Sequence, residues 1–248
     1  MGGKTFIEQT RSLTLKEHDV IIETIFGDKQ PCVPFRLKNK TNFNDIDIVE
    51  FEEDKLIELI RQAGVEIKTI KKIESCKGTK YENYSLNLLS TDNIQFDIIR
   101  PFNNSPSAKE FTRAFFSFGF ANIFLRQLTT VVSSVSKAHE MKAQEDFKIS
   151  YLGLFCYNNS LKLPSDCTYT IDETTRLITD LQFLFSLIDL NLSRYVKGFK
   201  DEFELLDYFK TSKFYPQVSF KVDNRFKHDI KRIAGFANLY HSNLLPLS

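Results

Sequence analysis

Residues 45–49 read Asp45-Ile46-Asp47-Ile48-Val49, an alternation of acidic and β-branched apolar residues. Alternation with a period of two predicts a β-strand, in which side chains two residues apart lie on the same face. Asp45 and Asp47 are therefore expected to project together, while the isoleucines that follow them point into the core. Two neighbouring carboxylates repel each other, and a bound divalent cation removes that cost. The stretch thus predicts a strand that carries a pair of metal ligands.

A third acidic residue has the same kind of neighbours. Asp97 lies within Ile94-Gln95-Phe96-Asp97-Ile98-Ile99, where apolar residues again flank a single acid in a strand pattern. Three carboxylates on neighbouring strands form a site for a hard cation, and oxygen ligands of this kind suit Mg²⁺ or Mn²⁺. A solvated strand face is the alternative for the Asp-x-Asp pair taken alone, because such pairs are common. The sequence therefore predicts a metal site formed by Asp45, Asp47 and Asp97.

The patterns around these acids predict an α+β fold for residues 1–103. Apolar residues at helical spacing predict two helices, each followed by a glycine stop, at residues 13–26 and 53–63. Strands are predicted at residues 32–36, 65–70, 84–89 and 94–99, and the last two flank a hairpin loop. The loop signals at residues 103–106 mark the boundary with a second subdomain, residues 104–248.

The second subdomain is expected to be mainly helical. Thr170 and Glu173 have the spacing of a capping box, and they predict a helix over the apolar run at residues 177–190. Further helices are predicted at residues 201–210 and 224–239. The last of these carries three basic residues that could contact a nucleic-acid backbone, namely Lys227, Lys231 and Arg232. A solvated helix face is the alternative interpretation of that basic run.

The composition is that of a folded protein without a strong charge bias. Of 248 residues, 42% are hydrophobic and 26% are charged, which argues against disordered, fibrous and membrane-spanning classes. Lys and Arg total 33 against 32 for Asp and Glu, so a nucleic-acid surface would have to be local. The four cysteines are widely spaced and no signal-like segment is recognised, so an intracellular protein is expected, cytoplasmic by default, with a nuclear or virus-associated protein as the alternatives.

The order of these elements resembles the palm of the nucleotidyltransferase superfamily, in particular the polymerase beta-like family X DNA polymerases. In that family a Gly-Ser turn and a loop precede the Asp pair, and a third Asp follows on a later strand. Here Pro34 and Phe35 stand in place of Gly-Ser, and the basic loop at residues 36–44 has the family's length. The aromatic run at residues 114–122 is similar to the family's turn at the nucleotide-binding edge, and residues 149–154 are similar to its NEYGL-type strand. The resemblance covers about residues 13–160.

The resemblance implies a two-metal enzyme. Asp45, Asp47 and Asp97 would hold two Mg²⁺ or Mn²⁺ ions and act as the catalytic residues. A nucleoside monophosphate would pass from a nucleoside triphosphate to a hydroxyl group, with release of pyrophosphate. The expected acceptor is an RNA or DNA 3′ end, and no membrane partner is expected. A protein or small-molecule acceptor is the alternative, as is a non-catalytic binding module, because the Gly-Ser turn and the family's DNA-gripping helix-hairpin-helix modules are missing.

The expected nucleotide contacts follow from the same resemblance. Pro34 has no N–H to offer a phosphate, so phosphate contacts are expected to shift to side chains of the basic loop. A solvated loop is the alternative for each of these side chains. The aromatic run is expected to lie near the nucleotide, although an aromatic cluster is more often core. The nucleotide-binding residues predicted in this way are Arg36, Lys38, Lys40, Phe118, Gly119 and Asn122.

Overall fold

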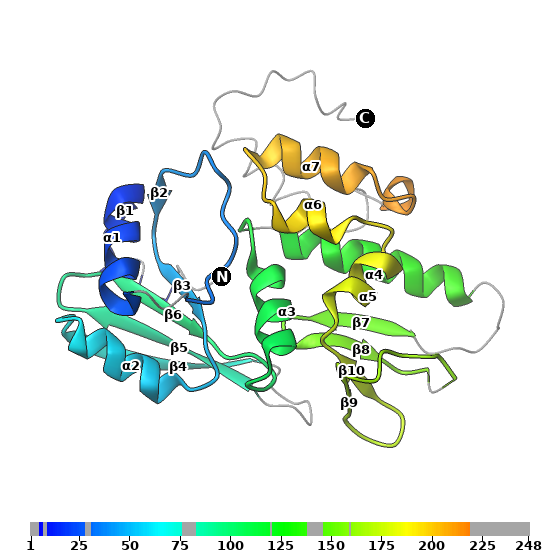
Figure 1. Ribbon diagram of the computed structural model, residues 1–248, viewed down its shortest axis with the longest axis horizontal. Coiled ribbons are helices and arrows are strands. Elements are labelled where there is room, and N and C mark those ends of the chain that lie inside the picture. Colours follow the sequence, from blue (N-terminus) through cyan, green and yellow to red (C-terminus); the bar gives the residue numbers. More distant parts are fainter. Residues whose placement is uncertain are drawn as a thin grey trace.

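The computed structural model describes residues 5–6, 9–27, 31–75, 83–119, 121–137, 146–158 and 160–218. They form an α+β structure whose two parts lie side by side in Figure 1, each with its own four-stranded sheet. The helix α3 (Pro106–Phe116) lies between them and contacts the strands β3 (Ile46–Val49) and β8 (Gly153–Cys156). The α+β class predicted from the sequence is therefore confirmed.

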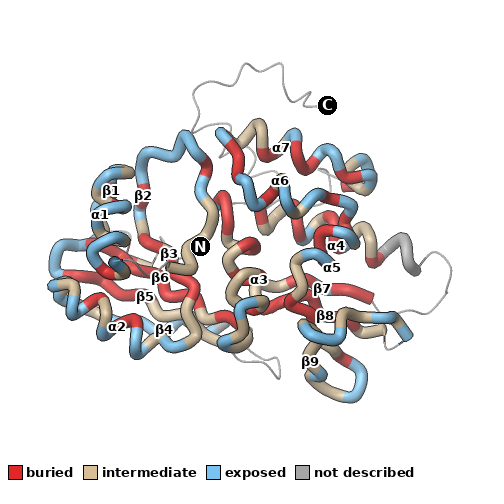
Figure 2. The backbone as a smooth tube through the Cα atoms, in the orientation of Figure 1, coloured by how far each residue is buried: buried red, intermediate tan, exposed pale blue. Residues whose placement is uncertain are grey.

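The first sheet is mixed and has the order β3-β6-β5-β4, completed by β6 (Gln95–Ile99), β5 (Asn83–Ser90) and β4 (Ile67–Ser75). Strand β3 pairs with β6 in parallel, whereas β6 with β5 and β5 with β4 are antiparallel. The predicted hairpin of residues 84–89 and 94–99 is confirmed as β5 and β6. Figure 2 shows that β6 lies in the buried interior.

Two helices cover this sheet, α1 (Leu15–Phe26) and α2 (Glu53–Gln62), and both agree with the sequence prediction within two residues. Helix α1 begins with a capping box in which Thr14 and Glu17 satisfy each other's backbone N–H groups. It ends at Gly27, whose φ of 55° is a conformation that glycine adopts without strain. Helix α2 buries Leu56, Ile57 and Ile60 in the core against the sheet.

The strand predicted at residues 32–36 is wrong. The segment 31–37 belongs to no strand, although Cys32 O accepts one hydrogen bond from Val49 N of β3. Its later residues bond to the turn after α3, because Phe35 N donates to Ser117 Oγ and Phe118 N donates to Phe35 O. The short strands that do pair in this region are β1 (Leu13–Thr14) and β2 (Asn42–Phe43).

The second part contains more β-structure than the sequence predicted. Its antiparallel sheet has the order β7-β8-β10-β9, with β7 (Phe147–Ser150), β10 (Arg176–Ile178) and β9 (Thr168–Thr170) beside β8. The expectation of a mainly helical second subdomain therefore missed a sheet, because its strands span only three or four residues each. The described α-helices that follow α3 are α4 (Ala121–Lys137), α5 (Leu181–Leu187), α6 (Leu192–Val196) and α7 (Glu202–Lys210), and a 3-10 helix spans Tyr215–Gln217.

The helix predicted over residues 177–190 begins later, at Leu181. The expected capping box is a hairpin turn between β9 and β10, in which Asp172 Oδ1 accepts bonds from the N–H groups of Thr174 and Thr175. The side chain that caps α5 is Asp180, which accepts from Phe183 N at 3.0 Å. The helix predicted at residues 201–210 is confirmed as α7, and the one at residues 224–239 lies outside the described residues.

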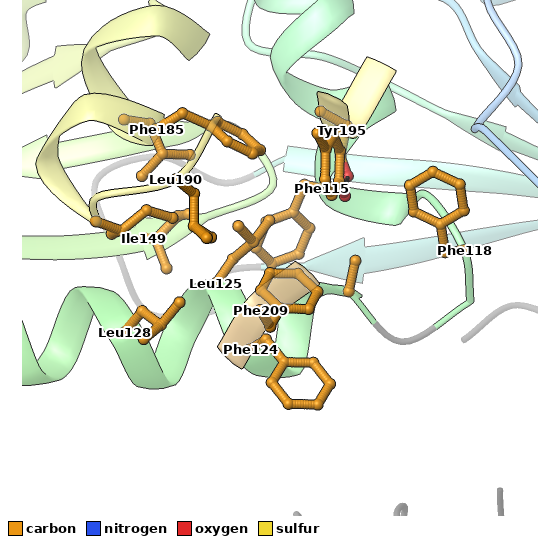
Figure 3. Close-up of a cluster of buried hydrophobic side chains, with 14 of the residues drawn as sticks. Phe115, Phe118, Phe124, Leu125, Leu128, Ile149, Phe185, Leu190, Tyr195 and Phe209 are labelled. Atoms are coloured by element: carbon orange, nitrogen blue, oxygen red, sulfur yellow. Dashed lines mark hydrogen bonds between the residues drawn. The ribbon is translucent and has the colours of Figure 1, made fainter. Parts of the chain in front are cut away.

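Aromatic side chains form the core of the second part (Figure 3). Tyr195 is fully buried, and its hydroxyl donates to Ala114 O at 2.8 Å. Its ring centroid lies 4.8 Å from that of Phe185 and 5.2 Å from that of Phe118. Because Phe118 belongs to the turn that binds the 31–37 segment, this core fixes the position of the loop that follows.

The helices of the described ranges differ in the length and hydropathy that decide whether a helix can span a membrane. No single helix there is long and apolar enough to cross a bilayer. Helix α3 and the first part of α4 meet the length and hydropathy criteria only as a pair bent by 104°.

Candidate metal centre

Three carboxylates converge on the first sheet. Asp47 in β3 and Asp97 in β6 are direct partners in the parallel register, and Asp45 stands immediately before β3. One carboxylate oxygen from each of the three residues lies within 4.8 Å of the other two, a grouping that could hold a metal ion. Strand pairing therefore unites residues that are fifty positions apart in the chain, as the sequence predicts.

The centre brings together three carboxyl groups whose negative charges repel one another. Burial and the charge of Asp45 raise the pKa of Asp97 to about 7. Burial, followed by the charges of Asp45 and Asp97, raises the pKa of Asp47 to about 8. Among the described residues, none of the three acids forms an ion pair within 4.0 Å. A divalent cation would supply the missing positive charge and would favour the ionised form of all three.

The two oxygens of Asp97 have different surroundings. Oδ1 accepts a hydrogen bond from Gln95 Nε2 at 2.7 Å and another from Asn87 Nδ2. Oδ2 is buried and has no hydrogen-bond partner among the described residues. A buried carboxylate oxygen without a partner is costly, so Oδ2 is the natural ligand atom for a cation. The donor set, all carboxylate oxygen, fits Mg²⁺ or Mn²⁺.

Asp45 and Asp47 line a cavity of about 1270 Å³ to which both parts of the protein contribute. The structure brings Arg36, Lys38, Lys40, Phe118 and Gly119 to the same cavity. Asp97 lies behind the other two acids, where only 3% of its surface is exposed. Asn122, in the first turn of α4, does not line the cavity. Most of the predicted site residues therefore share one space, and Asp97 and Asn122 are the exceptions among the described ones.

The basic loop is held firmly between the two parts. Lys38 N donates to Phe199 O at 2.9 Å, and Asn39 N donates to Lys200 O at 3.0 Å. Leu37 is buried in the aromatic core of the second part, while its neighbours Arg36 and Lys38 are exposed. The alternation anchors the backbone and directs the charged side chains outward.

The three cations of the loop differ in their partners. Arg36 forms a two-pronged ion pair with Asp19 of α1, with N–O distances of 2.6 and 3.1 Å. Lys40 Nζ lies 4.4 Å from the centre of the Phe43 ring. Lys38 forms no ion pair with any described residue. The positive charge of Arg36 is thus compensated, whereas the two lysines keep theirs for an anionic ligand.

The side chain of Phe118, which the sequence predicts to lie near the nucleotide, packs in the core. Although Phe118 borders the cavity, only 5% of it is exposed, and its ring packs 5.2 Å from Tyr195 and 5.1 Å from Phe199. Its backbone adopts a φ of 58°, which tightens the turn. Gly119, with a φ of 75°, is the exposed member of this turn. The geometry therefore favours backbone contact at Gly119 over base stacking on Phe118.

Sequence reasoning missed several residues of this region. Arg113 and Lys197 also line the cavity, and neither stands in a recognisable motif. Asn87 and Gln95 contact Asp97 directly, and their only signal in the sequence is an amide next to apolar residues of a strand pattern. The proposed nucleic-acid contacts of the C-terminal run, Lys227, Lys231 and Arg232, lie outside the described residues.

The comparisons with known proteins identify no relative of this chain. No protein-family model, no curated protein and no solved structure matches the chain. The functional assignment accordingly depends on the residues and geometry of the site.

Proposed function

We propose that the protein is a metal-dependent nucleotidyltransferase that transfers a nucleoside monophosphate from an NTP or dNTP to the 3′ hydroxyl of a nucleic acid, with release of pyrophosphate. The observation that carries this proposal is the convergence of Asp45, Asp47 and Asp97 within 4.8 Å, without a basic partner among the described residues. Such a centre, placed beside a cavity with a basic loop, suits a polyphosphate bound through metal ions.

Different residues of the chain would bind the metal ions, accept the proton and bind the phosphates. Asp45, Asp47 and Asp97 would hold two Mg²⁺ or Mn²⁺ ions, which supply charge neutralisation at the phosphates and lower the pKa of the attacking hydroxyl. The hydroxyl oxygen bonds to the α-phosphorus as the bond to pyrophosphate breaks, and we expect Asp97 to accept the hydroxyl proton. Lys38 and Lys40 would bind the departing phosphates as point charges.

The size of the cavity is compatible with two substrates. Its volume of about 1270 Å³ exceeds the roughly 300–1,000 Å³ of most small-molecule sites. A nucleotide would therefore leave room for the end of an acceptor. The alternative functions are transfer to a protein or small-molecule acceptor and binding without turnover. An assay with a panel of acceptors separates these possibilities.

The direct test incubates the purified full chain with labelled nucleoside triphosphates, Mn²⁺ and a panel of RNA, DNA and protein acceptors. We expect a labelled nucleic acid and stoichiometric pyrophosphate, and no product from a variant with Asp45→Asn and Asp47→Asn. Labelling of a protein acceptor alone would select the alternative acceptor. No product with any acceptor, from protein that is folded and binds nucleotide, would select the non-catalytic function.

We expect Mn²⁺ together with a nucleoside triphosphate to raise the melting temperature. A ligand that binds only the folded state stabilises it by about 2.7 kcal/mol at 100 times its Kd. For a chain of this size that corresponds to roughly 5–10 °C. The measurement is thermal unfolding with metal alone, nucleotide alone and both, and Asp47→Asn serves as the control that weakens metal binding. Unchanged melting at millimolar nucleotide would contradict a nucleotide site.

Lys38→Ala is expected to raise the KM for nucleotide about five- to tenfold with little change in kcat, because it removes an exposed contact to phosphate. Arg36→Ala should have a smaller effect, since Asp19 already compensates that charge. Lys55→Ala is a matched control, because Lys55 is exposed on α2 and paired with Glu52. Identical steady-state kinetics for Lys38→Ala and wild type would mean that the basic loop is a solvated surface without a role in nucleotide binding.

A further inference from the structure

We propose that Asn87 and Gln95 are positioning residues of the metal centre: their amides hold Oδ1 of Asp97, which leaves Oδ2 for the cation. The inference rests on the proposed function, because it assigns these amides a task at the same centre. It adds two residues that touch neither nucleotide nor metal but determine how Asp97 is presented.

The strand register places these groups in one row across the sheet. Asn87 in β5 is the direct partner of Asp97 in β6, and Asp97 is in turn the direct partner of Asp47 in β3. Direct partners on paired strands project to the same face. Gln95 lies two residues before Asp97 on the same strand, so it shares that face as well. The amides therefore approach Asp97 from the side of β5 and from along β6.

The burial of these amides requires an explanation. Asn87 is 2% exposed and Gln95 is 0% exposed, in a region where β6 is buried along its whole length. Burying an amide costs about 1–3 kcal/mol unless it is hydrogen-bonded. A sheet built only for stability would place apolar side chains at these positions. Both amides instead converge on a single oxygen of Asp97.

Neutral donors suit this task better than basic side chains. Amides fix the orientation of a carboxylate without cancelling its charge, whereas Lys or Arg would form an ion pair. The full charge of Asp97 thus remains available to a divalent cation. Hydrogen-bond partners of this kind orient metal ligands, and their removal typically lowers metal affinity or activity about 10–100-fold.

The test measures Mn²⁺ affinity by electron paramagnetic resonance, in the absence of nucleotide, for wild type and for Asn87→Leu and Gln95→Met. Both substitutions keep the side chain's size and remove the donor. We expect each variant to bind Mn²⁺ about tenfold or more weakly, with an altered spectrum of the bound ion. Gln62→Met is the matched control, because Gln62 is exposed on α2 and bonds only to Glu58 among the contacts described. Gln95→Met provides an independent test should Asn87→Leu fail to fold.

A double-mutant cycle separates positioning from a general effect on folding. In an Asp97→Asn background, Asn87→Leu should have no further effect on Mn²⁺ affinity, because the group that it orients has lost its charge. An equal loss in both backgrounds would overturn the proposal. Wild-type affinity in the single variants would overturn it too, while leaving the proposed function intact. Absence of Mn²⁺ binding by the wild type would instead contradict the proposed function itself.

Discussion

Asp97→Asn is expected to reduce turnover by about a thousandfold or more, the range in which loss of a general base falls, while the protein remains folded. The substitution keeps the shape of the side chain and removes one negative charge from the centre. If Asp97 holds a metal ion and accepts the hydroxyl proton, the chemical step should fail. Nucleotide binding through Asp45, Asp47 and the basic loop should largely survive.

The measurement is kcat at saturating nucleotide, together with circular dichroism to establish equal folding. Asp92→Asn is a matched control, since Asp92 is an exposed acid in the turn between β5 and β6. Activity of Asp97→Asn near that of wild type would refute the three-acid mechanism. Loss of activity together with loss of the fold would identify Asp97 as a structural acid of the sheet.

The same variant should change how stability depends on pH when EDTA keeps the protein free of metal. The folded-state pKa values of Asp97 and Asp47, about 7 and about 8, lie above those of unfolded carboxyls. Between the unfolded carboxyl pKa, about 4, and these values the folded state binds more protons, so the stability present at low pH is lost as the pH rises across that range. Between about pH 4 and pH 8, Asp97→Asn should therefore lose less stability than wild type or Asp92→Asn. Equal losses in all three proteins would contradict this assignment of the pKa values.

The local patterns of the sequence were sufficient to find the three acids. The period-two alternation around Asp47 and Asp97 depends only on neighbouring residues, and strand formation followed it. The partners of these acids depend on strand register, which a single sequence does not specify. The contacts of Asn87 and Gln95 with Asp97 therefore could not be predicted. The same holds for the ion pair between Arg36 in the basic loop and Asp19 in α1.

The errors in the second part have a common physical origin. Thr170 and Glu173 match a capping box, but a β-turn uses the same polar residue types, and Asp172 forms that turn. Short strands such as β10 gain their stability from pairing with the strands on either side, here β8 and β9, and not from their own few residues. An aromatic run likewise predicts burial without saying whether the rings face a ligand. The ring of Phe118 packs against Tyr195 and therefore belongs to the core.

Tyr195→Ala is expected to lower the free energy of unfolding by about 3–5 kcal/mol, the range for truncating a large buried aromatic side chain. This would be a large share of the roughly 5–15 kcal/mol that stabilises a typical domain. The ring packs against Phe118 and Phe35, so a cavity here would also loosen the turn and the segment that lead into the basic loop. Urea unfolding monitored by circular dichroism gives the change.

Tyr195→Phe is the control that separates packing from hydrogen bonding. It removes the bond to Ala114 O, which still accepts a bond from Ser117 N at 3.2 Å, so the cost should be only about 1 kcal/mol. Similar losses for the two variants would mean that the hydroxyl, and not the ring, holds this core together. If the ring dominates, Tyr195→Phe should keep the KM for nucleotide near that of wild type, because Phe118 and Phe35 retain the surface that positions the basic loop.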